Sequence, residues 1–381
     1  MEVNRERLAA NFTELCEIDS PSRHEGRISQ RLQQLFCELN AAEIIEDDSS
    51  SRTGSECGNL VIRFAGSLAL EPIFFSCHMD TVQPARDVQV KRTGDLLTSA
   101  GDTILGSDDK SGLAACIEAM RLLREEGQPH RPVEFVITTC EEIGLVGAKA
   151  LDPNLVQAKE GYALDSSGFA KVITHAPAAN RLTITVRGIA AHAGLHPEWG
   201  VSALIVAAKA LAQVPNGRID EETTANFGTI SGGTASNIVP EQVVIEGEVR
   251  SHSMEKLAHL TEVIREIFMT TVAGWTDPAG EAKGRPTVTV EVRQDFPVMR
   301  LSREDRIIRR VDAAARSIGM ELSYEKAGGG SDANIFNGYS LATAIIATGM
   351  TNVHSTSEQV ELQDMVDLTR LLIALLTEAS C

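Results

Sequence analysis

Residues 74–82 read Phe-Phe-Ser-Cys-His-Met-Asp-Thr-Val, an apolar run that ends in a histidine and, two positions later, an aspartate. Side chains alternate between the two faces of a strand, so we expect His78 and Asp80 on one face and Cys77 and Met79 on the other. An imidazole beside a carboxylate is how a metal-binding histidine is held in one tautomer. The stretch alone fits a buried strand with a satisfied histidine equally well, so its partners along the chain must decide.

Strand and helix patterns alternate after this stretch. Helical spacing predicts a helix over 112–126, and an apolar run predicts a buried strand over 132–139. This strand–helix–strand order favours βαβ units and a mostly parallel sheet, in which functional groups collect at the carboxyl ends of strands. His78 ends one such strand, and the pair Glu141 and Glu142 follows the next.

The pattern changes in the middle of the chain. Alternating and amphipathic runs there predict strands over 181–187, 242–250 and 287–292 and helices over 201–214 and 255–272. They are enough for a separate α+β domain with one open sheet face. Because the first pattern then returns, we expect a discontinuous α/β domain of residues 1–178 and 296–381 with residues 179–295 inserted.

Composition excludes several classes of protein. The chain has 381 residues, is 43% hydrophobic and 23% charged, and carries a net charge of −18 without a Lys/Arg-rich run. Nucleic acid and anionic membrane are therefore not expected partners. The seven cysteines contain no CxxC pair, which favours reduced thiols. Without a signal-peptide pattern or an apolar run near the ~20 residues that span a bilayer, the sequence predicts a cytoplasmic protein.

A set of polar side chains follows the strand-like runs. Its members are His78, Asp108, Glu141, Glu142, Asp165 and His354. Two histidines with several carboxylates suit divalent ions, foremost Zn²⁺, with Co²⁺ or Mn²⁺ as alternatives. A carboxylate can bridge two ions roughly 3.5–4 Å apart. Burying these groups without a cation would be too costly, so the sequence favours a metal site over a structural role. If both glutamates share it, the strand must break before them.

The motifs resemble those of a known family. In chain order they are SCHMDTV, GSDDKSG, TTCEEIG, ALDSSG, GIAAHAG, SNIVP, EGEVRS, GGGSDANIF and NVHSTSE. Together they resemble the metallopeptidase family M20, and within it the peptidase T-like (tripeptidase) branch. The resemblance covers nearly the whole chain and implies an α/β di-metal hydrolase domain with an inserted α+β lid or dimerisation domain.

The resemblance also implies a role for each member of the polar set. His78 and Asp165 would bind one metal ion, Glu142 and His354 the other, and Asp108 would bridge them. The spacing to Lys110 favours Asp108 over Asp109 as the bridge, and the family often has a cis peptide bond after it. Asp80 would orient His78, and Glu141 would be the general base that takes a proton from water and returns it to the leaving amine.

The resemblance assigns further residues to the substrate. His192, in the inserted domain, would stabilise the tetrahedral oxyanion. A substrate carboxylate would be held by Asn237, Arg250 and the backbone at Gly329 and Gly330. Without the resemblance, His192 reads as a turn histidine and Arg250 as half of an ion pair on a strand face.

The expected activity is hydrolysis of an amide bond in a short peptide, with release of the N-terminal residue of a tripeptide. An M20 deacylase of N-acyl amino acids would use the same metal ligands and stays an alternative. A non-catalytic metal- or peptide-binding homologue is a third, against which the presence of Glu141 argues. The resemblance also raises a homodimer formed through the inserted domain, with His192 acting in cis or in trans.

Overall fold

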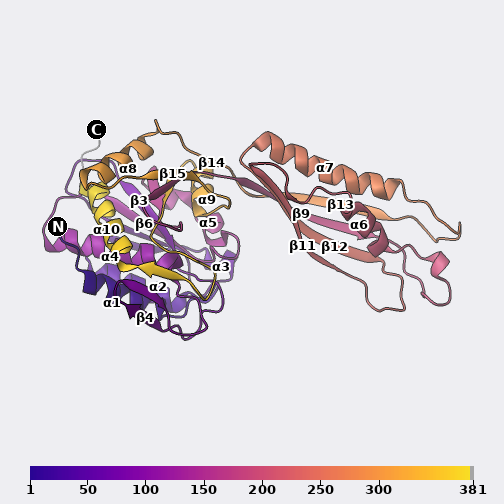
Figure 1. The fold of residues 1–381 in the computed structure, drawn as a ribbon, viewed down its shortest axis with the longest axis horizontal. Helices are drawn as coiled ribbons and strands as arrows, with labels where there is room; N and C mark the ends of the chain where they lie inside the picture. Colours follow the sequence, from indigo (N-terminus) through magenta and orange to yellow (C-terminus); the bar gives the residue numbers. More distant parts are fainter. Residues whose placement is uncertain (378–381) are drawn as a thin grey trace. The chain divides into compact units, whose positions relative to one another are not determined.

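The computed structural model describes residues 1–377, and these form two compact units (Figure 1). The first unit consists of Met1–Ala176 and the chain from Met299 onward, and the second of Pro177–Val298. The sequence predicted the divisions at 178/179 and 295/296, close to the strand ends that carry the chain between the units.

The first unit is an α/β structure. Its helices are α1 (Arg5–Cys16), α2 (Gly26–Glu38), α3 (Ser50–Thr53), α4 (Ser107–Glu125), α5 (Val146–Ala150), η1 (Pro153–Leu155), α8 (Arg306–Ser317), α9 (Asp332–Gly338) and α10 (Leu362–Thr377). Its strands are β1 (Glu43–Glu46), β2 (Leu60–Phe64), β3 (Ile73–His78), β4 (Val90–Thr93), β5 (Leu96–Ser99), β6 (Val133–Thr138), β7 (Glu160–Ala163), β8 (Lys171–Ala176), β14 (Met299–Arg300), β15 (Ser323–Lys326), β16 (Ala342–Ile346) and β17 (Gln359–Glu361).

Most of these strands form one mixed sheet in the order β1-β2-β6-β3-β7-β16-β8-β14, with β15 paired to β8. The central pairs β6–β3, β3–β7 and β7–β16 are parallel, while β1–β2, β2–β6, β8–β16 and β8–β14 are antiparallel. The mostly parallel centre agrees with the predicted βαβ order. The small sheet β17-β5-β4 was not predicted.

The two faces of β3 are covered differently. Phe75, Cys77 and Met79 belong to the large core that also holds the apolar side chains of α1, α4 and α10. Phe74 points to the other face, where its ring packs edge-on against Phe336 of α9. The alternation expected from the sequence is therefore confirmed, and His78 lies on the α9 face of the strand.

The second unit is built on an antiparallel sheet. Its elements are β9 (Ala178–Arg187), η2 (Pro197–Trp199), α6 (Ala203–Leu211), β10 (Gly217–Arg218), β11 (Thr223–Gly232), β12 (Gln242–Ser251), α7 (Met254–Ala273) and β13 (Thr287–Phe296). The strand order is β10-β11-β12-β9-β13. Both helices pack on the sheet and share its apolar core, so the unit is the α+β structure that the sequence predicted.

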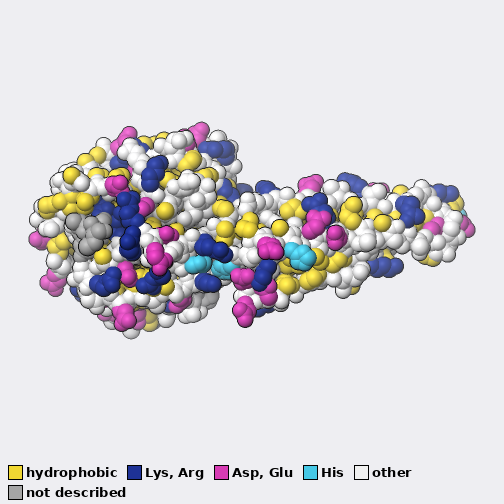
Figure 2. All heavy atoms as spheres, turned by 90° about the horizontal axis from the view of Figure 1, so that it is seen from above, with side chains coloured by type: hydrophobic (Ala, Val, Ile, Leu, Met, Phe, Trp, Pro, Cys, Tyr) yellow, Lys and Arg dark blue, Asp and Glu magenta, His cyan; other side chains and the backbone are white. Residues whose placement is uncertain are grey.

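The surface shown in Figure 2 mixes acidic and basic side chains rather than gathering one sign. Within residues 1–377, no helix is both long and apolar enough to cross a membrane.

Candidate metal centre

The carboxyl ends of four neighbouring strands carry the predicted site. β3, β6 and β7 are parallel neighbours, with His78 opposite Thr138 in register, and β16 runs parallel to β7. The carboxyl ends of parallel strands meet at one edge of a sheet. The chain just beyond the first three ends carries Asp80, Glu141 and Asp165, and the loop between β16 and β17 carries His354.

Asp108 stands between the two histidines. Its Oδ1 lies 3.0 Å from His78 Nε2, and its Oδ2 lies 3.3 Å from His354 Nε2. His354 Nε2 is also 3.1 Å from Glu142 Oε2. One ligand atom each from His78, Asp108 and Glu142 fall within 4.8 Å of one another, which suits a shared cation. The peptide bond between Asp108 and Asp109 is cis.

A break after β6 brings the two adjacent glutamates to the same region. The strand ends at Thr138, and Cys140 takes a positive φ of 53°. The backbone N–H groups of Glu141 and Glu142 then donate to the two oxygens of Asp80, at 2.9 and 3.3 Å. The chain has left the strand before the glutamates, as a shared site requires.

Asp80 acts on His78 in a different way from the one expected. His78 Nδ1 lies 2.9 Å from the backbone carbonyl of Asp80, whereas the Asp80 carboxylate is 3.5 Å from that nitrogen. The carboxylate instead accepts from Ser22 Oγ and from the two glutamate N–H groups. Asp80 therefore orients the His78 imidazole through its backbone carbonyl, and its carboxylate holds the turn that carries Glu141 and Glu142.

The buried charges at this edge perturb one another. Contacts with Asp108 and Glu142 raise the pKa of His354 to about 10. Burial is the main cause that raises the pKa of Glu141 well above its usual range, and the charge of Asp165 is the second cause. Burial likewise raises the pKa of Asp165, with the charge of Asp108 as the second cause. The two histidines hold the pKa of Asp108 below its usual range in spite of its burial. Carboxyl groups that are buried this close together suit a site that binds a cation.

The donor set fits divalent ions on its own chemistry. Imidazole nitrogens and carboxylate oxygens converge, and each Asp108 oxygen faces a different histidine. Among the described residues, Glu142 Oε1 is buried without a hydrogen-bond partner. A buried carboxylate oxygen normally has a partner, and a bound cation would provide one.

Asp332 is a carboxylate of this edge that the sequence did not single out. It is 4% exposed, and one of its oxygens accepts from Thr138 Oγ1. Burial raises its pKa to about 6, and its charge also raises the pKa values of Glu141 and Asp165. It lies within the motif GGGSDANIF, where only the glycines were assigned a role. Its place directly after that glycine-rich loop is the signal that could have found it.

The remaining predicted residues of the first unit are Gly329 and Gly330. They precede Ser331, whose side chain caps α9 in a capping box with Asn334. The loop is half-exposed, so its backbone is available to a ligand.

Two of the predicted residues in the second unit are neighbours. His192 forms a bridge with Ile238, and the N–H of Ala193 donates to the carbonyl of Asn237 at 2.9 Å. His192 Nδ1 accepts from the N–H groups of Gly194 and Leu195, which leaves Nε2 as the N–H donor. The imidazole is exposed and can offer a hydrogen bond to a ligand.

Arg250 is engaged within its own strand. Its guanidinium forms a two-point ion pair with Glu248, with Nε 2.9 Å from Oε1 and Nη2 3.0 Å from Oε2. It also lies over the ring of Phe296, 5.9 Å from the centroid. The ion pair on a strand face, which the sequence left open as an alternative, is present.

Comparisons with known proteins identify the family of the chain. The model of the peptidase family M20/M25/M40 matches residues 74–378. The chain is 39% identical to a crystal structure of aminopeptidase PepT from Bacillus cereus, with 98% of each chain covered and a TM-score of 0.87. It is 34% identical to a tripeptidase from Staphylococcus aureus, with 99% of each chain covered and a TM-score of 0.88.

A more distant structure shares the fold. A Bacillus subtilis protein described as a dinuclear metal-binding M20 peptidase is 15% identical, with 97% of each chain covered and a TM-score of 0.72. The chain belongs to peptidase family M20/M25/M40. Within it, the chain falls in the peptidase T-like branch and is a metallopeptidase that acts on peptides. The family resemblance seen in the sequence is confirmed.

Proposed function

We propose that the protein is a di-metal aminopeptidase that releases the N-terminal residue of tripeptides. The observation that carries the proposal is the position of Asp108, whose two oxygens face His78 and His354 separately. Two ions joined by one carboxylate would account for this arrangement. Full-length similarity to an aminopeptidase and a tripeptidase supports the peptide specificity. The cytoplasmic location expected from the sequence stays a prediction.

We assign His78 and Asp165 to one ion, Glu142 and His354 to the other, and Asp108 to both. Mixed nitrogen and carboxylate ligands favour Zn²⁺, with Co²⁺ and Mn²⁺ as alternatives. When bound, such ions lower the pKa of water toward ~7 and polarise a carbonyl.

Glu141 is the proposed general base. Burial and the nearby Asp165 already raise its pKa, so it can hold a proton between two transfers. It accepts a proton from the attacking water and hands it to the leaving amine. Asp80 keeps the glutamate in place through the Glu141 N–H, at 2.9 Å.

The substrate-binding residues also stay proposals. His192 would donate from Nε2 to the oxyanion, a role supported by the two N–H groups that occupy Nδ1. Asn237, Gly329 and Gly330 would bind the peptide carboxylate. Arg250 can join them only if it exchanges its pair with Glu248 for the substrate.

We propose that the protein forms a homodimer through its second unit. On its outer side, β11 pairs with β10 only at Thr224 and Ala225, within the residues that the structure describes. Ile230 of β11 is 52% exposed. Ile205 is 55% exposed and lies on α6, which packs on the neighbouring strand β12. An unpaired strand edge beside exposed apolar side chains suits a second copy of the chain. Sedimentation should give a dimer that Ile205→Glu weakens; a wild-type monomer would end this proposal.

A substrate screen tests the proposed activity. The metal-loaded protein would be given unblocked tripeptides, dipeptides and N-acyl amino acids, and the products identified by mass spectrometry. We expect the N-terminal residue to be released fastest from tripeptides. Faster hydrolysis of N-acyl amino acids would instead establish the deacylase alternative.

A further inference from the structure

Glu358 is a buried carboxylate of the first unit that the proposed mechanism does not use. It is 2% exposed and lies four residues after His354, in the chain between β16 and β17. A carboxylate this deeply buried needs several donors or a cation to offset its desolvation.

Four donors to this carboxylate come from one short stretch of chain, which leads into α4. Oε2 accepts the N–H groups of Leu105 and Gly106, at 2.8 and 2.9 Å. Oε1 accepts Ser107 Oγ at 2.6 Å and the Asp108 N–H at 3.1 Å. Gly106, the N-cap residue of α4, offers no side chain of its own for capping. Glu358 therefore satisfies the backbone of this stretch from a distant loop, and one of the N–H groups that it binds belongs to the proposed bridging aspartate.

The loop that carries Glu358 is tied together internally. Thr351 and Gln359 exchange both backbone hydrogen bonds at its base, at 2.9 and 3.0 Å. Within it, the Glu358 N–H donates to the Ser355 carbonyl at 3.1 Å, and Ser355 Oγ donates to the Asn352 carbonyl at 2.6 Å. Because the loop is closed on itself, fixing Glu358 also restricts His354.

We propose that Glu358 is a positioning residue that locks the His354 loop to the backbone of Asp108. The lock sets the separation of two side chains that, in the proposed function on which this inference rests, hold the same metal ion. Without it, His354 would depend on its own contacts with Asp108 and Glu142. These contacts restrain only an imidazole that is half exposed, at the tip of a loop.

Glu358→Gln is the sharpest test, because it keeps the shape of the side chain. An amide presents one acceptor oxygen and one NH₂ group, so two of the four donors lose their acceptor. We expect affinity for the more weakly bound Zn²⁺ to fall about 10–100-fold, as for other groups that orient metal ligands. The first Zn²⁺ should bind as in the wild type. kcat at limiting Zn²⁺ should fall with little change in KM, and excess Zn²⁺ should restore it.

Glu134→Gln is the matched control. Glu134 is 3% exposed, and one of its oxygens also accepts two backbone N–H groups, from Gln157 and Ala158. It lies near the amino end of β6, away from the predicted ligands, so its variant should bind both ions normally. Ser107→Ala removes one of the four donors and should give a smaller loss than Glu358→Gln, which keeps the test valid if the latter folds poorly.

Calorimetric titration of metal-free protein with Zn²⁺ separates the outcomes. If the wild type binds two ions and both Glu358→Gln and Ser107→Ala bind them with wild-type affinity, Glu358 has no positioning role. The positioning role is equally excluded if Glu134→Gln weakens binding to the same extent, because the effect is then general destabilisation. A wild type that binds fewer than two ions would instead overturn the proposed function.

Discussion

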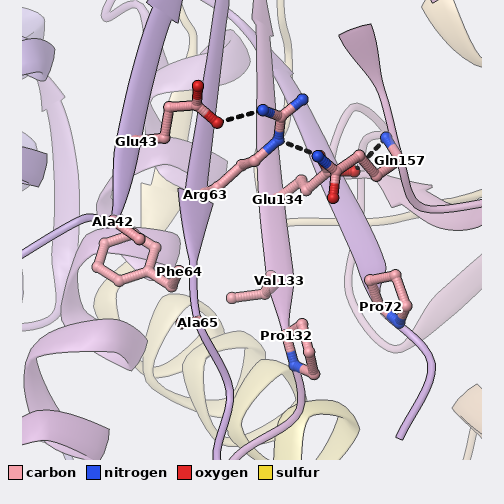
Figure 3. Close-up of a pocket in the computed structure, with 10 residues that line it drawn as sticks. All are labelled: Ala42, Glu43, Arg63, Phe64, Ala65, Pro72, Pro132, Val133, Glu134 and Gln157. Carbon is pink, nitrogen blue, oxygen red and sulfur yellow. Dashed lines mark hydrogen bonds and ion pairs between the residues drawn. The ribbon is translucent and has the colours of Figure 1, made fainter. Parts of the chain in front are cut away.

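The two ends of the central sheet treat buried carboxylates in opposite ways. At the amino end of β6, Glu134 Oε1 lies 2.8 Å from Arg63 Nε (Figure 3). Its other oxygen accepts the N–H groups of Gln157 and Ala158. Arg63 also pairs with Glu43 on the edge strand. These carboxylates find their partners within the chain itself, and with Arg63 and Phe64 they line a pocket.

At the carboxyl end, carboxylates face histidines and one another. His354 lies within ion-pair distance of Asp108 and of Glu142, and burial raises the pKa values of Glu141 and Asp165. The difference indicates that burial alone does not identify a functional carboxylate. The informative feature is a group of acids that the fold leaves short of positive charge, and here two divalent ions would supply it.

The largest expected effect is on kcat, which should depend on the carboxylates at the carboxyl end of the sheet and not on Glu134 at the amino end. Glu141→Gln should lower kcat by about 10²–10⁴-fold, because the amide cannot accept the proton of the attacking water. Its metal content should match that of the wild type. Glu134→Gln, the same chemical change at the other end, should leave kcat unaltered. Loss of metal from Glu141→Gln together with the activity would mean that Glu141 is a metal ligand, and an unaltered kcat would mean that it is not the base.

The next effect is on metal content. His354→Ala removes a proposed ligand, so elemental analysis of protein dialysed without added metal should give one ion per chain in place of two. Activity should fall with it, and thermal unfolding should become less sensitive to added Zn²⁺. Two tightly held ions in this variant would remove His354 from the ligand set.

A pH dependence should appear at the carboxyl end only. In the metal-free chain, contacts with Asp108 and Glu142 raise the pKa of His354 to about 10, so it is protonated at pH 7. A metal ion that binds His354 must displace this proton. Affinity for Zn²⁺ should therefore rise with pH from about 6 to 8, with protons released to the buffer. Calorimetry in buffers of different ionisation enthalpy measures the release, and a pH-independent affinity would contradict it.

The smallest effect on activity belongs to the amino end. Glu134→Gln weakens the pair with Arg63 and replaces one acceptor of a buried network, so it should lower the free energy of unfolding by ~1–3 kcal/mol. Urea unfolding measures this loss. A fall in kcat/KM as large as that of Glu141→Gln would show that the two ends are not independent.

The sequence predicted the elements that alternate clearly. The alternation around His78 and the apolar run over 132–139 indicated the parallel strands and their faces, since period and burial are local properties. The short strands β4, β5 and β17 were missed, because each is three or four residues long and only their pairing makes them strands.

The site was predictable as a set of residue types, but not in its internal contacts. Order along the chain and family motifs brought His78, Asp108 and His354 together. The Asp80 carboxylate accepts two backbone N–H groups from a turn that is distant in sequence, and Glu358 accepts N–H groups from the stretch that leads into α4. Such contacts carry no periodic signal, and a single glutamate in a polar loop looks solvated until the fold buries it.

The most direct measurement of the central claim is the number of divalent ions bound per chain. Metal-free protein titrated with Zn²⁺, with binding followed by calorimetry and the product checked by elemental analysis, should take up two ions per chain and gain peptidase activity as they bind. Full activity with one bound ion, or with none, would contradict a carboxyl end balanced by two cations.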